Sequence, residues 1–423
     1  MLGFLGSSSF CARALLCAPV ALALNGGAAS AQAQTRATEA APSFNAAQLR
    51  GIDRVGPNYT IQTPVRSDGL MRNYLLATPY GEIQIQGDEM LKMRLNEFVA
   101  LSLLEKVSGS NTFAKSLVEA GLNPLKYTGR LITNPIGTVQ STLGGIGAMF
   151  GRIGSGLNNA GKTQDDPLAG LLGVTSERRT IAAAYGVDPY TDFAPLDAKL
   201  KQLSEAAALG GLAVSGALLA VPGAAGIVVS NLSTANKLDN IAISDLALQY
   251  TAAQILDLNR AKLTAMGVSS ELNAVILANR NYTPIDMAAM VAALDSMKDV
   301  AGRPVFIDRA AAADTRATAF FMRRLAELMA KEARPRGYAQ IVALGGLPFA
   351  LTRDGRIVTV APIDALSWTP ESAARFGSFT TERRALAPKS TGELRITGQA
   401  TALAKKQLKA EGWSVVDSVP PGK

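Results

Sequence analysis

Residues 206–236 contain no charged side chain, and this stretch constrains the fold more than any other feature of the chain. It lies between Glu205 and Lys237 and consists mostly of Ala, Gly, Val and Leu. It exceeds the roughly 20 residues that a helix needs to cross a bilayer, but Val221-Pro222-Gly223 interrupts it. Two shorter helices therefore fit better than one span. Three interpretations stay open: a buried helical hairpin, a hairpin that dips into one leaflet, or a true span. The candidate membrane contacts are Leu218, Leu219 and Ile227.

A second stretch is uncharged and amphipathic. No charged residue lies between Arg130 and Arg152, and bulky apolar residues recur within residues 132–157 at alternating spacings of three and four. That spacing places them on one stripe of a helix, opposite a side of Thr, Gln, Ser, Asn and Gly. The apolar stripe, a further set of candidate membrane contacts, consists of Ile136, Val139, Leu143, Ile146, Phe150, Ile153 and Leu157.

Glycine weakens this helix in isolation, because each helical glycine costs up to about 1 kcal/mol relative to alanine. A glycine-rich helix of this kind needs a surface on which to fold. A bulky stripe opposite an uncharged polar face is typical of helices that lie in a membrane interface. The alternative is a helix that packs closely against a neighbour, with Gly147 and Gly151 allowing the close approach.

The chain begins with the pattern of an export signal. An apolar run from Ala12 to Leu24 is followed by small residues that supply an A-x-A cleavage site, and the run is too short to span a bilayer. We therefore expect residues 1–33 to be a signal peptide and the mature protein to be periplasmic or attached to the cell envelope. A retained N-terminal anchor is the alternative.

Composition excludes several chemistries. The chain has no histidine, and its two cysteines, Cys11 and Cys17, both lie in the expected signal peptide. The mature chain therefore cannot form a Ser-His-Asp triad, a Cys-His dyad, a histidine-ligated metal site or a disulfide. We expect no cofactor and no bound metal, and carboxylates remain the only common acid-base groups.

Positive charge is concentrated at the end of the chain. Residues 301–423 contain 19 Lys and Arg against 11 Asp and Glu, which accounts for the whole net charge of +8. A basic region of this kind is either a solvated surface or a contact for an anionic partner. We consider a lipid surface, an envelope protein or an anionic polymer as that partner. Nucleic acid is not expected, because no interleaved aromatic and basic motif appears.

One phosphate-binding motif is judged a chance match. Gly156, Gly161, Lys162 and Thr163 fit the GxxxxGK[ST] pattern. In a true P-loop the glycines follow a buried strand and begin a helix, whereas here they follow the amphipathic stripe. Two carboxylates, Asp165 and Asp166, come directly afterwards and would repel a phosphate.

A group of acids around Tyr190 is a candidate cation site. Asp188, Asp192 and Asp197 lack the alternating spacing and central glycine of a calcium loop. We interpret them instead as acids that cap helix ends.

The periodicities predict an α+β fold that is predominantly helical. A small antiparallel β unit with a turn at Ser67-Asp68-Gly69 precedes a helix that begins at Asp88, and a mixed α/β module ends the chain in a β-α-β unit. A long helix is expected over 240–266. The expected regions are 1–33 (signal peptide), 34–55 (flexible lead-in), 56–127 (β-hairpins plus helices), 128–300 (helical region containing the amphipathic 132–157 and the uncharged hairpin 206–236) and 301–423 (basic mixed α/β module).

These features favour an exported, non-enzymatic envelope protein that binds or supports other envelope material and associates peripherally with a membrane. One alternative is a carboxylate-based hydrolase of cell-wall or polysaccharide substrate. Another is a secreted protein that inserts into membranes or forms pores. The missing histidine makes an enzyme the less expected of these.

Overall fold

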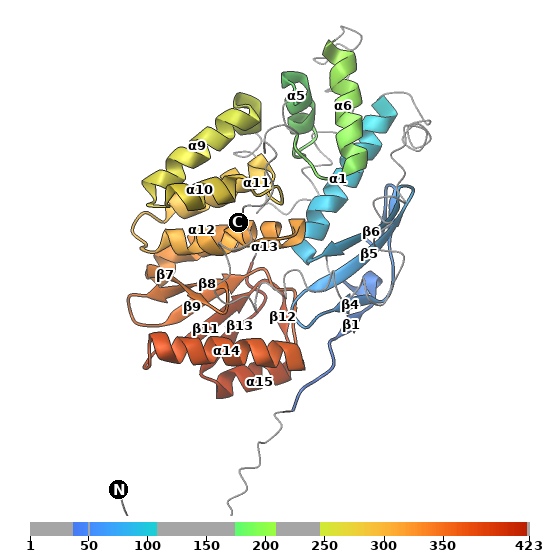
Figure 1. Cartoon of the computed structure of the whole chain (residues 1–423). Helices are drawn as coiled ribbons and strands as arrows, with labels where there is room; N and C mark the ends of the chain where they lie inside the picture. The colour runs from blue at the N-terminus through green and yellow to red at the C-terminus, as the bar shows by residue number, and fades with distance from the viewer. Residues whose placement is uncertain (1–36, 50, 108–173, 209–245, 421–423) are drawn as a thin grey trace, which may run out of the picture. The chain divides into compact units, whose positions relative to one another are not determined.

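A six-stranded antiparallel sheet forms the N-terminal part of the described chain (Figure 1). The structure is a computed structural model that describes residues 37–49, 51–107, 174–208 and 246–420. The predicted turn at residues 67–69 is confirmed, because the Asp68 carboxylate accepts hydrogen bonds from the backbone N–H groups of Leu70 and Met71. The strands are β1 (Ser43–Phe44), β2 (Val55–Gly56), β3 (Tyr59–Ile61), β4 (Val65–Ser67), β5 (Arg72–Thr78) and β6 (Gly81–Gln86).

Helix α1 (Asp88–Val107) follows this sheet and shares a hydrophobic core with it. Phe98 is fully buried, and its ring lies 5.5 Å from that of Tyr59 on the sheet. The helix predicted to begin at Asp88 is therefore confirmed, and its apolar residues face the sheet as their spacing indicates.

A set of helices follows, most of them capped by a threonine or serine whose side chain accepts a backbone hydrogen bond. Thr175 and Thr283 act as N-caps in this way, and Pro284 occupies the first turn of its helix. These helices are α5 (Ser176–Ala184), α6 (Ala194–Ala208), α9 (Ala252–Ala265), α10 (Ser270–Leu277), α11 (Pro284–Ser296), α12 (Arg303–Ala311) and α13 (Arg316–Arg336).

The single long helix expected over 240–266 is wrong within the described residues. Residues 246–249 are helical, the chain then breaks at Tyr250, and α9 begins after Thr251. Thr251 and Gln254 form a reciprocal capping box, which starts a new helix inside a run whose apolar spacing looks continuous.

The C-terminal module contains a five-stranded mixed sheet of order β13-β11-β9-β8-β7. β9, β11 and β13 are parallel, and the predicted β-α-β ending is confirmed by β11, α15 and β13. Figure 1 shows α12 and α13 on one face of this sheet and α14 and α15 on the other. The elements are β7 (Tyr338–Leu344), β8 (Leu347–Thr352), β9 (Ile357–Ala361), α14 (Pro370–Leu386), β11 (Gly392–Ile396), α15 (Ala402–Ala410) and β13 (Trp413–Val416), with a separate pair formed by β10 (Ala365–Leu366) and β12 (Gln399–Ala400).

The described residues from Thr38 onward belong to one compact unit. Its largest core combines residues of α9 to α13 with those of the C-terminal sheet, and both Trp368 and Trp413 are buried in it. Among the described residues about 50% are helical and about 20% are in strands, which confirms a mixed α+β fold.

Candidate functional site

The predicted membrane contacts lie outside the described residues. This holds for Ile136, Val139, Leu143, Ile146, Phe150, Ile153, Leu157, Leu218, Leu219 and Ile227, and also for the motif residues Gly156, Gly161, Lys162 and Thr163. Of the uncharged stretch 206–236, the structure describes residues 206–208 as the end of α6. Among the helices that are described, none combines the length and the apolar character needed to cross a bilayer.

The three acids around Tyr190 take separate partners. The Asp188 carboxylate accepts a hydrogen bond of 2.6 Å from the Thr283 hydroxyl, while Asp192 and Asp197 pair with two different arginines. These acids therefore anchor neighbouring helices. Within the described residues no three potential metal ligands gather at one point.

Asp192 belongs to a largely buried chain of ion pairs, and Asp188 lies next to it. Ten side chains of alternating charge connect α1, residues 188–193, α11 and α13, and most of its members are shared between two partners. We call this series the ion-pair chain. In order, its members are Glu97, Arg94, Asp192, Arg316, Asp286, Arg323, Glu327, Arg324, Glu89 and Lys92.

Arg316 occupies the middle of the ion-pair chain. Its guanidinium contacts Asp286 at 2.6 Å through Nη1 and Asp192 at 3.4 Å through Nε. Helical spacing brings the α13 members together, because Arg316 and Arg323 are seven residues, or two turns, apart. Asp286 lies in the first turn of α11, where the partial positive charge of the helix end also favours a carboxylate.

Two carboxyl groups of this region resist ionisation. Burial raises the pKa of Glu97 to about 7, although the Arg94 guanidinium opposes the shift. Burial and the neighbouring Asp286 charge raise the pKa of Asp188 to about 6. Among the described residues Asp188 forms no ion pair and accepts hydrogen bonds from Thr283 and from the backbone N–H of Tyr190.

Asp286 behaves in the opposite way. Burial opposes its ionisation, but the Arg316 and Arg323 guanidiniums outweigh that effect and hold its pKa below the usual value. The region can therefore hold four segments of the chain together and also exchange protons near neutral pH at Glu97 and Asp188.

The ion-pair chain lies near the first described residue after each of the two longer undescribed segments. Val174 follows residues 108–173, and Leu246 follows residues 209–245. Both side chains pack against one small hydrophobic cluster that contains Tyr190 and Ile285, the neighbours of Thr191 and Asp286 in sequence. Two segments far apart in the chain thus return to the same place.

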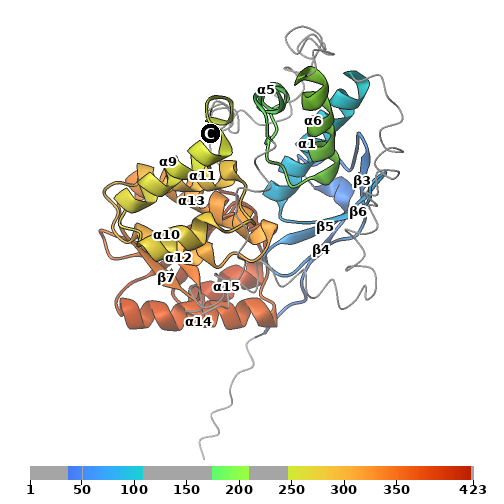
Figure 2. The same ribbon diagram turned by 45° about the horizontal axis from the view of Figure 1, so that its top comes forward.

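The helices that precede residues 108–173 and 209–245 also lie together. α1 and α6 lie side by side and run in the same direction (Figures 1 and 2). The ring of Phe98 on α1 lies 4.7 Å from that of Phe193, directly before α6. Further toward the C-terminal end of both helices, Glu105 of α1 lies near Lys199 of α6. The C-terminal ends of α1 and α6 therefore face the same way.

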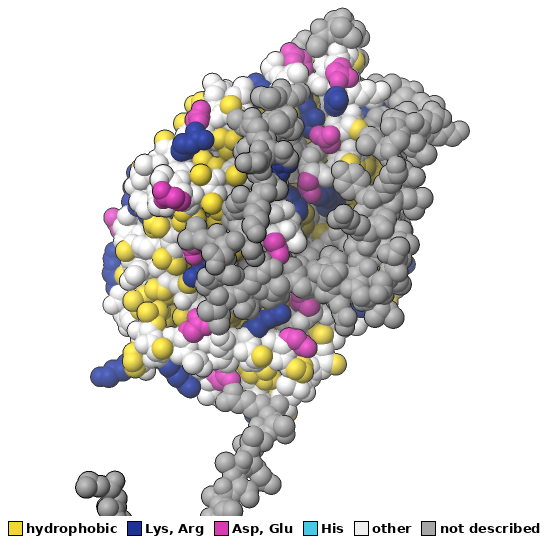
Figure 3. Space-filling view, viewed as in Figure 1, with side chains coloured by type: hydrophobic (Ala, Val, Ile, Leu, Met, Phe, Trp, Pro, Cys, Tyr) yellow, Lys and Arg dark blue, Asp and Glu magenta, His cyan; other side chains and the backbone are white. Residues whose placement is uncertain are grey.

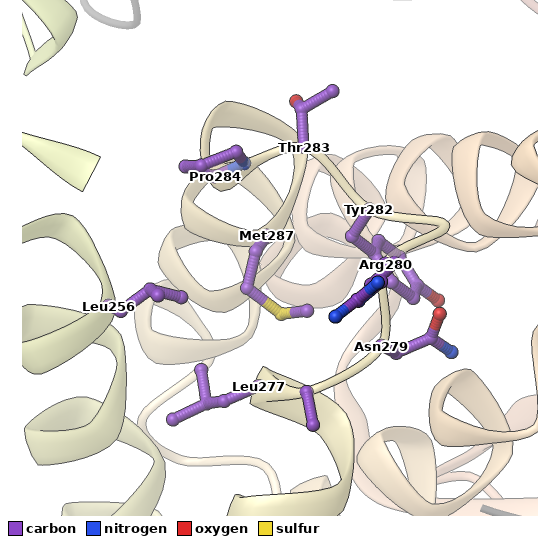
Figure 4. A pocket seen from close by; sticks show the side chains of 9 residues that line it. Leu256, Leu277, Asn279, Arg280, Tyr282, Thr283, Pro284 and Met287 are labelled. Atoms are coloured by element: carbon purple, nitrogen blue, oxygen red, sulfur yellow. The ribbon is translucent and has the colours of Figure 1, made fainter. Parts of the chain in front are cut away.

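A small pocket borders Thr283 (Figure 4). Its volume of about 30 Å³ has room for one or two waters. Figure 4 shows Met287 between Leu256 and Leu277, with Arg280 across the pocket. A wider groove of about 450 Å³ between α9 and α10 shares Leu256 and Leu277 with it. No member of the ion-pair chain lines either space.

Comparisons with protein-family models, with curated protein sequences and with solved structures find no match. The site is therefore interpreted from its own geometry.

The arginines of the ion-pair chain were not singled out from the sequence. A local signal exists for three of these four arginines. Arg94 is three residues from Glu97 on a helix, and Arg323 and Arg324 are four and three residues from Glu327 on another. The partners of Arg316 are 30 and 124 residues away, so no local pattern reveals them.

Proposed function

We propose that this chain is an exported, non-enzymatic protein of the cell envelope that associates peripherally with a membrane. Residues 132–157 and 206–232 would make the membrane contact, residues 1–33 would direct export, and the basic C-terminal module would meet anionic material or an envelope protein. A predominantly helical chain, including the two uncharged segments, is part of this proposal.

The paired attachment of the two segments supports this function most directly. Val174 and Leu246, the first described residues after these two segments, both pack against the cluster containing Tyr190 and Ile285. The helices that precede the segments, α1 and α6, run in the same direction. Segments tethered at both ends to neighbouring points can act on one surface together. Residues 131–151 and 206–236 carry no charge, and this composition makes a lipid interface the surface that fits them best.

A liposome flotation assay tests the proposal. The chain lacking residues 1–33 should float with vesicles of phosphatidylcholine and phosphatidylglycerol. A variant with Ile146→Ser and Phe150→Ser should float at least tenfold less, because two large apolar side chains would no longer enter the interface. The matched control is Asn134→Ser with Ala148→Ser, which changes the opposite side of the same expected helix and should float like the unmodified protein.

Two results would contradict this function. If the unmodified chain stays in the dense fraction with every lipid mixture, the membrane association does not exist. Release of a dye trapped in the vesicles would show insertion, and the pore-forming alternative would replace peripheral association. Recovery of a tagged full-length chain in the cytoplasm after cell fractionation would contradict export.

A further inference from the structure

Three loops and three helix ends lie at one edge of the C-terminal sheet. The parallel strands β9, β11 and β13 all begin there, since Ile357 and Trp413 are both paired with Gly392. The loops that precede these strands, around residues 353–356, 387–391 and 409–412, consequently lie side by side.

Side-chain contacts join the helix ends to the same edge. The Arg383 guanidinium, in the last turn of α14, donates hydrogen bonds to the backbone oxygens of Ser390 and Glu411. The backbone N–H of Arg353 donates to the oxygen of Gly337, directly after α13. α13, α14 and α15 therefore all end where the three parallel strands begin.

This edge carries exposed positive charge that its acids do not neutralise. Glu393 and Glu332 are already engaged by Arg336 and Arg395. Arg356 pairs with Glu393 and also with Asp354, the acid on the 353–356 loop. Five further cations are exposed, and none of them forms an ion pair within the described residues. We call them the basic edge: Arg334, Arg353, Arg384, Lys389 and Lys409.

Helix ends account for part of this pattern, because cations in a last turn complement the partial negative charge of the helix C-terminus. Arg353 and Lys389, however, lie on loops and have no helix end to complement. Figure 3 shows Lys and Arg side chains projecting at the lower left of the molecule, on the side where α14 ends in Figure 1.

A large apolar side chain lies among these cations. Leu386 is 52% exposed and stands between Arg384 and Lys389 in sequence. A soluble polyanion would contact the cations alone and would leave this leucine in water. A bilayer with anionic headgroups accommodates both, because the cations meet phosphates while the leucine enters the interface.

We propose that the basic edge, with Leu386 at its centre, binds an anionic lipid surface. The basic edge shares no residue with 132–157 or 206–232, so separate variants test the two contacts.

Vesicle co-sedimentation as a function of salt tests this contact. The chain lacking residues 1–33 is mixed with vesicles of phosphatidylcholine and phosphatidylglycerol, or of phosphatidylcholine alone. Each cation near an anionic surface contributes about fivefold in affinity. The triple variant Arg384→Gln, Lys389→Gln and Lys409→Gln should therefore bind the anionic vesicles about 100-fold more weakly at low salt and be unchanged on neutral ones.

Two matched controls accompany it. Arg54→Gln, Arg66→Gln and Lys298→Gln remove the same charge from exposed sites elsewhere and should lower affinity less than threefold, through net charge alone. Leu386→Ser should weaken the binding that persists at high salt, whereas Leu258→Ser, at a comparably exposed leucine, should not.

Equal losses in the edge variant and its charge control would overturn the proposal. Edge-dependent binding to soluble polyphosphate with none to anionic vesicles would also overturn it, and would assign the edge to an anionic polymer. Loss of flotation in the Ile146→Ser, Phe150→Ser variant concerns the proposed function alone, so the two failures are distinguishable.

Discussion

At the residue scale, Arg316 shows how one side chain keeps two carboxylates charged in the interior. Asp286 is almost fully buried, and Arg316 and Arg323 are its two cationic partners. Removing a charge from water costs several kcal/mol, so a buried ion pair adds little net stability compared with apolar packing. Removing one partner costs more, because the buried Asp286 carboxylate would then have Arg323 as its one remaining cationic partner among the described residues.

Arg316→Met should lower the free energy of unfolding by up to about 3 kcal/mol, because Asp286 would keep only Arg323 and Asp192 only Arg94 as a cationic partner. Urea unfolding followed by circular dichroism measures this loss. Arg260→Met is the matched control, because Arg260 also pairs with an aspartate, Asp257, but both side chains are more than half exposed. That change should cost at most about 1 kcal/mol. Equal costs for the two variants would show that the ion-pair chain is not buried in solution.

At the element scale, protonation at Glu97 and Asp188 couples the packing of α1, the 188–193 segment and α11 to pH. The folded state raises the pKa of Glu97 from 4.5 to about 7 and that of Asp188 from 3.8 to about 6, in both cases chiefly through burial. At a pH between the unfolded and the folded pKa of each group, the carboxyl is protonated in the folded protein and ionised in the unfolded chain. Stability is therefore greatest at mildly acidic pH and falls as the pH rises through the folded values.

The unfolding free energy should drop between about pH 4 and about pH 7, and Glu97 alone should contribute up to about 3 kcal/mol of that drop. Urea titrations across this range measure the slope. Glu97→Gln should flatten it, because the amide oxygen still accepts the hydrogen bond from Thr191 but carries no proton to lose. Glu371→Gln, at an exposed position, should leave the slope unchanged. A Glu97→Gln protein with the original slope would contradict the assignment.

At the scale of the whole molecule, Asp364 links the N-terminal sheet and α1 to the C-terminal module. Its buried carboxylate accepts hydrogen bonds from the backbone N–H groups of Arg72 and Asp88, and the Leu70 oxygen accepts from the N–H of Asp364 in return. Burial and the Asp88 charge raise the pKa of Asp364 well above its usual range. Phe320, on α13, belongs to the core of α1, so that helix contributes to both cores.

Asp364→Ala should separate the unfolding of the two cores, because two buried N–H groups would lose their acceptor at about 1–3 kcal/mol each. The chain has two tryptophans, and both lie in the C-terminal module, so their fluorescence reports that core. Hydrogen exchange of the backbone amides of α1 reports the unfolding of the N-terminal core. The two urea midpoints should coincide in the unmodified protein and differ in Asp364→Ala, whereas Asp364→Asn keeps an acceptor and should behave more like the parent. Coincident midpoints in Asp364→Ala would show that other contacts couple the cores.

Features that depend on neighbours in the chain could be predicted from the sequence. The turn at residues 67–69, the Thr175 and Thr283 caps and the final β-α-β unit each follow from a few adjacent side chains and their backbone. α14 was not predicted, because its Gly, Ser and Thr residues weaken the helical pattern and its burial against the sheet supplies the missing stability.

The sequence by itself determined the local elements, the absence of histidine chemistry and the placing of the net charge in residues 301–423. The tertiary structure alone decided which charges meet. Arg94 and Asp192 are 98 residues apart, and the basic edge collects cations from five separate parts of the module. A hydrogen-bonded turn or cap is chosen by residues within one helical turn, whereas an ion pair between distant residues exists only where the packing of whole helices and sheets brings them together.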